Sequence, residues 1–350
     1  MSQIKRYFIS LGKACNMHCI YCHQGGDKPV CPALHVENAD VQKIRDIVSY
    51  FPKTGKYAVT LYGGEPLLYW DTIVRLVDAL RNNNPDIKIG MPTNGLLLTT
   101  SKALKLNELD VMVGLSHDGP VFEKTRRSKD ILKINPEPFL TLNTRSISAV
   151  VSKLNWNFYD VWEYFDEFSL KHNCCGPVRK ENIQIQIAKD VENNTPEELL
   201  ILDMPEFEQM LDKVFDNLEN HIRNKEFTSY EYQQYRGFIE TLNLRLKEPD
   251  KIGIWCGADK QVAHLDMEGN LYVCHNVAKP YGNVRNFKEI KPGGYNPYLY
   301  DSKCIACPAY IICGGACPVA HPDKRKYTCY FMYQQVTRLF NMLHNLNKTY

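Results

Sequence analysis

Cys15-Asn-Met-His-Cys19-Ile-Tyr-Cys22 places three thiols within eight residues, after an apolar run over residues 7–11 that is typical of a strand. Thiolates are ligands that zinc, copper(I) and iron–sulfur clusters prefer. A structural zinc site takes four ligands and a catalytic one three plus water, and the next thiol along the chain is Cys31. A four-iron cluster bound through three irons would leave one iron open. The spacing alone leaves an open iron–sulfur cluster, a zinc site and a chance arrangement as alternatives.

The composition is that of an ordinary globular chain without a strong net charge. Its 350 residues carry 42 Lys and Arg against 40 Asp and Glu, a formal net charge of +2. This balance predicts no nucleic-acid partner and no membrane partner. The sequence has no apolar run of about 18 residues that would span a membrane. Its first residues lead straight into a predicted strand, so we expect no signal peptide and a cytoplasmic location.

Thirteen cysteines are many for such a chain, and their placement is uneven. In a long chain without an export signal, thiols are more often metal ligands or catalytic groups than disulfide partners. Three lie at 15–22 and seven between 256 and 329, which predicts two metal-rich regions. Cys31, Cys174 and Cys175 have no assigned role.

The first half of the chain alternates short runs of β-branched and aromatic residues with longer stretches of helical periodicity. Such alternation is typical of βα units around a parallel sheet. The predicted strands cover residues 6–12, 57–62, 87–91, 111–116, 140–151 and 183–188, and the predicted helices cover 38–51, 71–83, 101–107 and 157–171. The pattern predicts an α/β fold, either an open or partial barrel or a doubly wound sheet.

The pattern changes further along the chain. From Pro205 to about Lys247 it is helical, with Pro205 near the first turn and acidic residues beside it, as helix N-termini prefer. Beyond about residue 250 the chain is rich in Gly, Pro, Cys and Tyr. We therefore expect three segments, residues 1–203, a helical linker over 204–250 and a cysteine-rich domain over 251–350.

Polar motifs follow three successive predicted strands. They read Tyr62-Gly63-Gly64-Glu65-Pro66, Pro92-Thr93-Asn94-Gly95 and Ser116-His117-Asp118-Gly119-Pro120. In a parallel barrel the loops after the strands line one face, where ligands bind. Any one of these motifs is consistent with a simple tight turn, because glycine permits such turns. All three in order, after the cysteine triplet, predict a shared cofactor pocket.

The cysteine triplet and the three motifs together resemble the radical S-adenosylmethionine (radical SAM) superfamily, whose members share a partial (β/α)6 TIM-like barrel. The resemblance implies that Cys15, Cys19 and Cys22 hold a [4Fe–4S] cluster, and that the amine and carboxylate of S-adenosylmethionine chelate its open iron. One-electron reduction then cleaves the cofactor to methionine and a 5′-deoxyadenosyl radical, which abstracts a hydrogen atom. Residues 1–203 would form the barrel, and the missing fourth ligand would be the cofactor.

The resemblance also implies cofactor-binding roles for residues in the matching motifs. Glu65 resembles the acid that accepts a hydrogen bond from the methionine amine, and Gly63 and Gly64 resemble the glycines that let the backbone approach closely. Tyr21 resembles the aromatic residue that packs near the adenine.

The later motifs carry less specific expectations. Ser116 and Asp118 resemble polar contacts to the ribose or the methionyl end, and Thr93 and Asn94 lie at the appropriate strand end. An arginine often helps to hold the methionine carboxylate in this family. Nothing in the sequence chooses among three candidates, which are Arg126, Arg127 and Arg145.

The C-terminal run Cys304-x2-Cys307-x5-Cys313-x3-Cys317 packs soft ligands and glycines together, which suits an iron–sulfur cluster or a zinc ribbon. The pattern of seven cysteines closely resembles the SPASM extension of radical SAM enzymes, which carries two auxiliary [4Fe–4S] clusters. By this resemblance one cluster is held by Cys304, Cys307, Cys313 and Cys329, and the other by Cys256, Cys274 and Cys317. The fourth ligand of the latter is open to Asp259, His264, Cys174, Cys175 or a substrate thiol.

His275 occupies a position where the pattern departs from one familiar group. Anaerobic sulfatase-maturing enzymes place an aspartate base directly after the second SPASM cysteine, whereas this chain has His275 there. An imidazole can accept a proton near neutral pH, so His275 is our candidate acid/base. The alternative is that it only packs beside a cluster.

The resemblance favours an oxidoreductase that modifies a peptide or protein side chain, by crosslinking or a related maturation of a ribosomally made peptide. The alternatives are a radical SAM enzyme with a small-molecule substrate and a non-catalytic zinc or iron–sulfur scaffold. We expect a reductant such as flavodoxin or ferredoxin as a partner. Cys15 lies too early in the chain to follow a leader-binding domain, so recognition would use a separate leader-binding protein, the helices at 190–250, or no leader.

Overall fold

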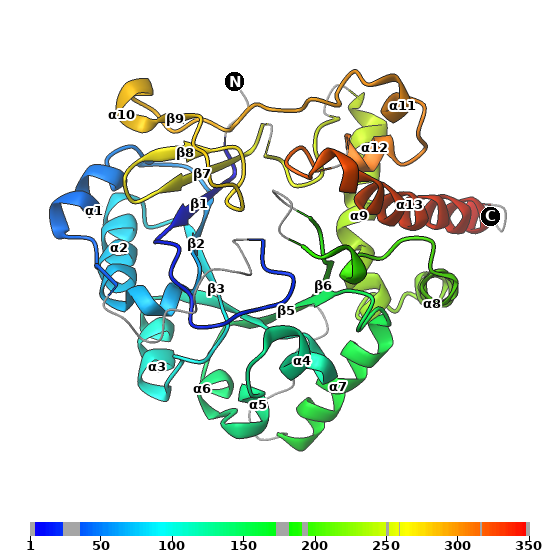
Figure 1. The fold of residues 1–350 in the computed structure, drawn as a ribbon, viewed down its shortest axis with the longest axis horizontal. Coiled ribbons are helices and arrows are strands. Elements are labelled where there is room, and N and C mark those ends of the chain that lie inside the picture. Colours follow the sequence, from blue (N-terminus) through cyan, green and yellow to red (C-terminus); the bar gives the residue numbers. More distant parts are fainter. Residues whose placement is uncertain are drawn as a thin grey trace. The chain divides into compact units, whose positions relative to one another are not determined.

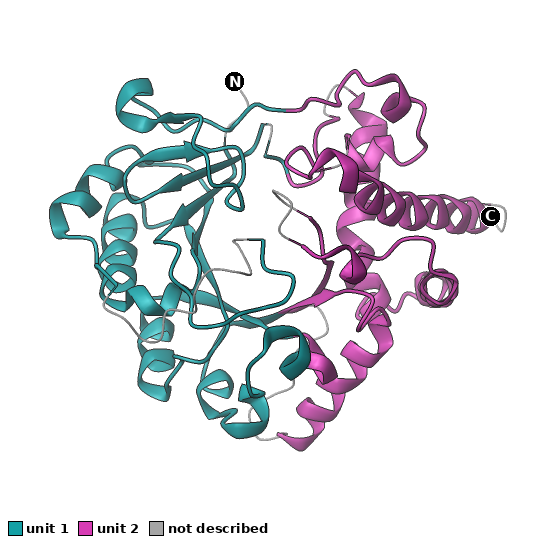
Figure 2. Ribbon diagram, in the orientation of Figure 1, with its two compact units in different colours: residues 1–117, 122–147, 257–295 teal, residues 118–121, 148–256, 296–350 magenta. Residues whose placement is uncertain are grey.

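The computed structural model describes residues 4–23, 36–172, 182–190, 195–249, 252–258, 260–315 and 317–347. Predictions that concern Cys31, Cys174, Cys175 and Asp259 lie outside these residues. The chain divides into two compact units, coloured teal and magenta in Figure 2. Unit 1 comprises Met1–His117, Phe122–Ile147 and Gly257–Tyr295, and unit 2 comprises Asp118–Val121, Ser148–Cys256 and Asn296–Tyr350.

Unit 1 is built on a largely parallel sheet with strand order β4-β3-β2-β1-β7-β8-β9. Its strands are β1 (Arg6–Ser10), β2 (Ala58–Tyr62), β3 (Lys88–Thr93), β4 (Val111–Ser116), β7 (Val262–Asp266), β8 (Asn270–Tyr272) and β9 (Gly282–Asn283). The pairs among β1 to β4 are parallel, as is β1 with β7, whereas β8 and β9 run antiparallel. Ser10 lies opposite Tyr62, so the loops after β1 and β2 leave the sheet side by side.

Helices α1 (Val41–Val48), α2 (Trp70–Asn83) and α3 (Thr100–Glu108) lie along one side of these strands (Figure 1). Strand residues alternate in burial because successive side chains point to opposite faces. Ile9 and Leu61 are fully buried in the core, whereas Phe8 and Tyr62 point to the other face and are half-buried. That second face carries the aromatic and polar side chains of the site described below.

The remaining elements of unit 1 correct one prediction. Short helices α4 (Phe122–Arg126), α5 (Ile131–Ile134) and α6 (Glu137–Leu140) precede β5 (Arg145–Val151), and α10 (Val284–Phe287) follows β9. The first three residues of β5 belong to unit 1 and the other four to unit 2. The strand predicted over 140–151 therefore begins at Arg145, because the chain at its expected start is the end of α6. Pro136 precedes α6 and Pro138 lies in its first turn, where proline suits a helix start.

Unit 2 is mainly helical. It contains α7 (Phe158–Lys171), β6 (Ile183–Ile187), α8 (Pro205–Arg223), α9 (Tyr230–Lys247), α11 (Ser302–Ile305), α12 (Tyr310–Cys313) and α13 (Arg325–Asn347). Helix α8 packs against both α9 and α13. The fully buried Tyr235 of α9 donates a hydrogen bond to Gln335 of α13 at 3.0 Å. The helical stretch predicted from Pro205 to about Lys247 is confirmed as α8 and α9.

The two units do not follow the three predicted segments. Residues 257–295 belong to unit 1 with the barrel strands, whereas 204–256 and 296–350 belong to unit 2. The division into 1–203, 204–250 and 251–350 stays a prediction. Across the described ranges, none of the helices combines the length and the apolar character that a bilayer crossing requires.

Candidate functional site

Two glycines after β2 hold the segment that leads into the cysteine loop. Gly64 N donates to Gly12 O at 3.0 Å, and Glu65 N donates to Ala14 O at 2.8 Å. A Cβ atom at Gly63 would lie 2.6 Å from the Gly12 oxygen, and one at Gly64 would lie 2.2 Å from the Ala14 oxygen. Only glycine permits this approach of two backbones. The close approach expected of these glycines toward the cofactor stays a prediction.

Asn94, at the end of β3, reaches the first residues of the cysteine loop. Its Nδ2 atom donates to Asn16 Oδ1 at 2.7 Å and lies 4.0 Å from Cys15 Sγ. Met17 N lies 3.4 Å from the same sulfur. Burial raises the pKa of Cys15, and the hydrogen bond from Met17 lowers it. The structure thus brings together the cysteine and strand-end motifs that the sequence associated with one pocket.

Glu65 joins the loops after β2 and β3. Its side chain is 1% exposed and accepts hydrogen bonds from Thr93 Oγ1 at 2.6 Å, Asn94 N at 2.8 Å and Leu67 N at 2.9 Å. Burial raises the pKa of this carboxyl, whereas the bonds from Asn94, Thr93 and Leu67 lower it. Glu65 is therefore a brace within the protein, and its contact with the methionine amine stays a prediction.

The three candidate arginines have different surroundings in unit 1. The Arg126 guanidinium lies 5.7 Å from the ring centre of the buried Tyr21, and Ile20 N donates to Thr125 O at 2.9 Å. Arg127 is exposed. Arg145 donates to the carbonyl oxygens at the end of α6 and just after it, at 2.8 and 2.9 Å. Of the three, Arg126 is the one beside the cysteine loop.

The motif after β4 contributes mainly structural contacts. His117 is fully buried, its Nε2 lies 2.9 Å from Asp130 Oδ1, and its ring stacks on Phe122. Within unit 2, the buried Asp118 accepts a hydrogen bond from Val150 N at 2.9 Å. Ser116 is half-buried at the end of β4. The expected contacts of Ser116 and Asp118 with the cofactor stay predictions, and the buried His117–Asp130 pair was not expected.

His275 lies in a cluster of rings on the second face of the unit 1 sheet. Its ring stacks on Phe8 at 4.6 Å between ring centres, and Tyr62 lies edge-on at 4.4 Å. His275 Nδ1 is 3.4 Å from Nδ1 of the buried His264, so one of the two nitrogens must carry the proton. Burial, and then the charge of His23, lowers the pKa of His275 to about 3. Burial likewise lowers the pKa of His264.

These surroundings bear on two expectations from the sequence. An imidazole with so low a pKa is neutral at neutral pH, and the acid/base role expected of His275 stays a prediction. His264, considered as a cluster ligand, packs its ring 4.9 Å from that of Phe8. The sequence identified His275 by its position after Cys274. Its aromatic neighbours come from β1 and β2, and the sequence around His275 gave no indication of them.

In unit 2 the structure brings C-terminal cysteines together around Arg325. Cys304 lies in α11, and Cys329 lies in α13. Arg325 Nη2 donates to Cys304 Sγ at 2.6 Å. Cys329 is an exposed residue, so only partial loss of water raises the pKa of its thiol. The charge of Arg325 lowers this pKa, and the thiols of Cys304 and Cys307 raise it. Three of the four predicted ligands of this cluster therefore interact, and the fourth, Cys313, ends α12.

The donor set of this group fits an iron–sulfur cluster. It consists of thiols, and the buried Nε atom of Arg325 has no hydrogen-bond partner among the described residues. A cluster offers sulfur acceptors to such a donor. No group of three or more His, Cys, Asp or Glu side chains in the described ranges has the close spacing of a single-ion site; the thiols around a four-iron cluster stand further apart.

The segment before Cys256 is fixed to the loop after α12. Trp255 N donates to Cys313 O at 3.1 Å, and a Cβ atom at Gly314 would lie 1.9 Å from the Gly253 oxygen. Cys256 and Cys317 belong to unit 2 and Cys274 to unit 1. The cluster assigned to these three cysteines stays a prediction.

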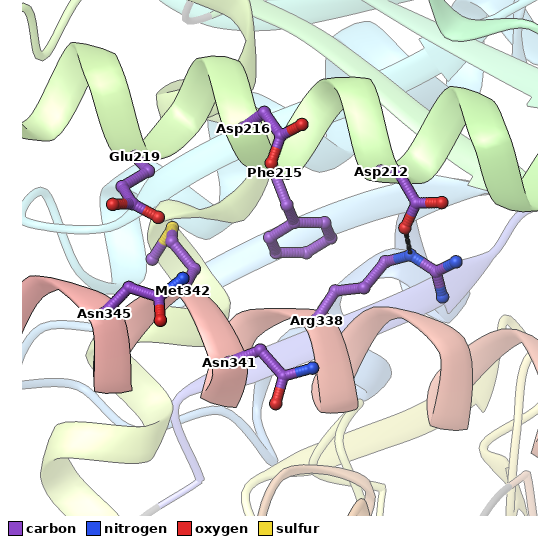
Figure 3. A pocket seen from close by; sticks show the side chains of 8 residues that line it. All are labelled: Asp212, Phe215, Asp216, Glu219, Arg338, Asn341, Met342 and Asn345. Atoms are coloured by element: carbon purple, nitrogen blue, oxygen red, sulfur yellow. Dashed lines mark hydrogen bonds and ion pairs between the residues drawn. The ribbon is translucent and has the colours of Figure 1, made fainter.

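A cavity of about 180 Å³ lies elsewhere in unit 2, between α8 and α13. Figure 3 shows its lining side chains, among them Asp212, Asp216, Glu219 and Arg338. Arg338 Nε pairs with Asp212 Oδ1 at 2.7 Å, so part of its charge is neutralised. None of the predicted site residues lines this cavity.

Known sequences resemble this chain over different lengths. The model of the radical SAM superfamily matches residues 9–141. The radical SAM cyclopropyl synthase TigE of Paramaledivibacter caminithermalis is 24% identical over 90% of this chain and 68% of its own length. A cysteine-type anaerobic sulfatase-maturating enzyme of Clostridium perfringens is 23% identical over 95% of this chain and 96% of its own. An uncharacterised protein of Methanocaldococcus jannaschii is 29% identical over 33% of this chain, and the match spans 39% of that protein.

Solved structures share the fold. Native anSMEcpe with bound AdoMet has a TM-score of 0.70 at 18% identity, covering 99% of this chain and 100% of its own. SuiB of Streptococcus suis bound to precursor peptide SuiA has a TM-score of 0.59 at 16% identity, and the match covers 91% of this chain and 73% of SuiB. The predicted α/β partial-barrel core is therefore confirmed. The match of the family model shows that residues 9–141, which include the cysteine loop and the braced strand-end motifs, are a radical SAM domain.

Proposed function

We propose that this enzyme oxidatively modifies a side chain of a peptide or protein, as in the maturation of ribosomally made peptides. The observation that carries the radical SAM part is the bracing of the cysteine loop by Gly63, Gly64, Glu65 and Asn94. It supports a cluster at Cys15, Cys19 and Cys22. When bound, this cluster and S-adenosylmethionine supply the radical that removes a hydrogen atom from the substrate.

The chain's own residues would hold and orient the cofactor. The Glu65 carboxylate fixes the Thr93 hydroxyl and the Asn94 backbone, so the loops after β2 and β3 keep one arrangement. Arg126, stacked near Tyr21, has the position and charge to hold the methionine carboxylate. Tyr21 would pack near the adenine, and Ser116 and Asp118 would meet the ribose or the methionyl end.

The C-terminal cysteines would hold two auxiliary [4Fe–4S] clusters in a SPASM domain. Contacts among Cys304, Cys307, Cys329 and Arg325 support the first. Cys256, Cys274 and Cys317 would hold the second. The chemistry these clusters would supply is one-electron redox capacity, which an oxidation begun by hydrogen abstraction requires.

The relatives support a peptide or protein as the substrate. They include a sulfatase-maturating enzyme and a structure bound to its precursor peptide. This chain, however, has His275 where a sulfatase-maturing enzyme would have an aspartate base. We therefore propose a different bond-forming outcome, with His275 as a hydrogen-bonding group beside the substrate and a low-potential donor such as flavodoxin or ferredoxin as the reductant. Leader recognition by α8 and α9, or by a separate leader-binding protein, is part of the same proposal.

Co-expression with candidate precursor peptides tests the substrate class. We expect the peptide to lose the mass of two hydrogens with the wild-type chain and to stay unchanged with Cys19→Ala. If all peptides stay unchanged and only the wild type consumes a small molecule, the substrate is a small molecule and not a peptide. If the wild-type chain binds zinc and modifies neither peptides nor small molecules, the protein is the non-catalytic scaffold.

A further inference from the structure

Arg325 stands at the centre of the C-terminal cysteine group in unit 2. It is the first residue of α13, and Cys329 follows it by four residues, on the same side of the helix one turn later. Arg325 Nη2 donates to Cys304 Sγ at 2.6 Å. Its charge and a hydrogen bond from it also act on the Cys329 thiol. One guanidinium therefore donates to a thiol of α11 and lowers the pKa of a thiol of α13.

Its neighbours hold this guanidinium in place. The Arg325 Cζ atom lies 3.5 Å from the ring centre of Tyr298, and Nη1 lies 4.0 Å from Asp301 Oδ2. Asp301 also caps α11 by accepting from Lys303 N at 2.9 Å and Cys304 N at 3.1 Å. Asp301 therefore lies beside the guanidinium and also holds the backbone of Cys304, whose thiol accepts from Arg325. A cation stacked on an aromatic face loses little by partial burial.

One N–H donor of Arg325 has no hydrogen-bond acceptor among the described residues. Its Nε atom is buried and has no hydrogen-bond partner there. A buried donor without an acceptor destabilises a protein, so such an atom is expected to face an acceptor that binds later. The thiols around it are the ligands expected of an iron–sulfur cluster, whose sulfur atoms accept hydrogen bonds.

We propose that Arg325 is a positioning residue that sets the reduction potential of the cluster held by Cys304, Cys307, Cys313 and Cys329. A cluster with four thiolates is negatively charged and becomes more so when a donor reduces it by one electron. A fixed positive charge and N–H donors beside it stabilise the reduced form more than the oxidised form, which raises the potential. The inference rests on the auxiliary cluster in the proposed function.

The test is a potentiometric titration of the reconstituted full chain, followed by the electron paramagnetic resonance of the reduced cluster. Cys19→Ala and Cys274→Ala in the background remove the other two proposed clusters. We expect Arg325→Gln to lower the ratio of reduced to oxidised cluster at a fixed potential at least tenfold, about 59 mV for one electron. Arg325→Lys keeps the charge and stays closer to the wild type. Lys326→Gln is the matched control, because it removes the same charge from the next residue, whose Nζ lies over the ring of Tyr327.

Several results would overturn the proposal. An Arg325→Gln chain that titrates like Lys326→Gln shows that the guanidinium does not set the potential. If Arg325→Gln loses four iron atoms, the Arg325→Lys variant becomes the test. The proposal requires Arg325→Lys to retain the four iron atoms and to have a potential near that of the wild type. Loss of iron from both variants contradicts the proposal. A Cys307→Ala chain that binds as much iron as the background shows that the cluster itself is absent. Loss of iron in Cys307→Ala with an unchanged potential in Arg325→Gln removes this inference alone.

Discussion

At the cysteine loop, one buried carboxylate connects two strand-end motifs. Glu65 accepts hydrogen bonds from the Thr93 hydroxyl and from the Asn94 backbone N–H. The Asn94 side chain in turn donates to Asn16. The sequence identified Glu65 through its motif, with a contact to the cofactor as its expected role. The structural role of Glu65 depends on its contacts with Thr93 and Asn94 at the end of another strand. Such contacts join residues about thirty positions apart, and the local sequence gives no sign of them.

Glu65→Gln tests this brace. Both carboxylate oxygens accept, so the NH2 group of the amide would face a backbone N–H of either Asn94 or Leu67. We expect the free energy of unfolding to fall by about 1–3 kcal/mol. Glu108→Gln, which removes an exposed carboxylate paired with Lys105, is the control and should change stability little. Urea unfolding of the cluster-free chains measures both. Equal stability of the two variants would contradict the brace.

Arg126→Gln tests the arginine assignment. A charge-assisted hydrogen bond contributes about 1.5–3 kcal/mol, so we expect the affinity for S-adenosylmethionine to fall about tenfold or more. Arg145→Gln, which loses contacts to carbonyl groups around α6, should not weaken binding specifically. Equilibrium binding to the reconstituted chains decides, and an unchanged affinity in Arg126→Gln would assign the carboxylate to another residue.

The low pKa of His275 predicts a dependence of stability on pH. The folded chain keeps this imidazole neutral down to pH 3, whereas the unfolded chain protonates it near pH 6.5, so the unfolded state binds more protons between these values. Stability therefore falls as the pH drops from 7 toward 3, by at most about 1.4 kcal/mol per pH unit from this group.

His275→Gln should make the loss of stability between pH 7 and pH 5 smaller. His344→Gln, at an exposed position on α13, is the control and should leave the slope as it is. Urea unfolding of cluster-free chains at both pH values gives the comparison. A slope in His275→Gln that equals that of the wild type would show that His275 titrates normally.

At the scale of elements, the strands and helices of the first half follow the sequence pattern closely. The strand predicted at 111–116 is β4, and the helix predicted at 71–83 is α2, longer by one residue. The exceptions have physical reasons. The apolar residues Leu140 and Leu142 favoured a strand start at 140, but Pro136 and Pro138 open α6 there. The long helix α13 was not predicted, because the chain beyond about residue 250 is rich in Gly, Pro, Cys and Tyr and was expected to form a cysteine-rich domain.

The same scale offers a test of the loop after β2. Gly64→Ala places a methyl group 2.2 Å from the Ala14 carbonyl oxygen, which displaces the segment before Cys15. We expect the reconstituted chain to bind about four fewer iron atoms. Gly90→Ala in β3 is the matched control, since its Cβ atom meets nothing closer than 3.6 Å. Full iron content in Gly64→Ala would contradict the role of this contact.

At the scale of the whole molecule, the placement of the motifs predicted a shared pocket, and their resemblance to the radical SAM superfamily implied the partial-barrel core. The sequence did not predict that β7 pairs in parallel with β1, which brings residues 262–266 into the sheet of unit 1. Pairing between segments so far apart along the chain leaves no periodic pattern in the sequence. The aromatic cluster around His275 follows from this pairing, since His264 of β7 lies opposite Phe8 of β1.

The central claim is that the braced Cys15–Cys22 loop binds a cluster that cleaves S-adenosylmethionine. The most direct measurement is the amount of 5′-deoxyadenosine formed when the anaerobically reconstituted chain receives dithionite and S-adenosylmethionine, compared with Cys19→Ala. We predict that the wild type forms 5′-deoxyadenosine and methionine in equal amounts and that Cys19→Ala forms neither. A wild-type chain that holds its full complement of iron and sulfide and yields no 5′-deoxyadenosine would contradict the account.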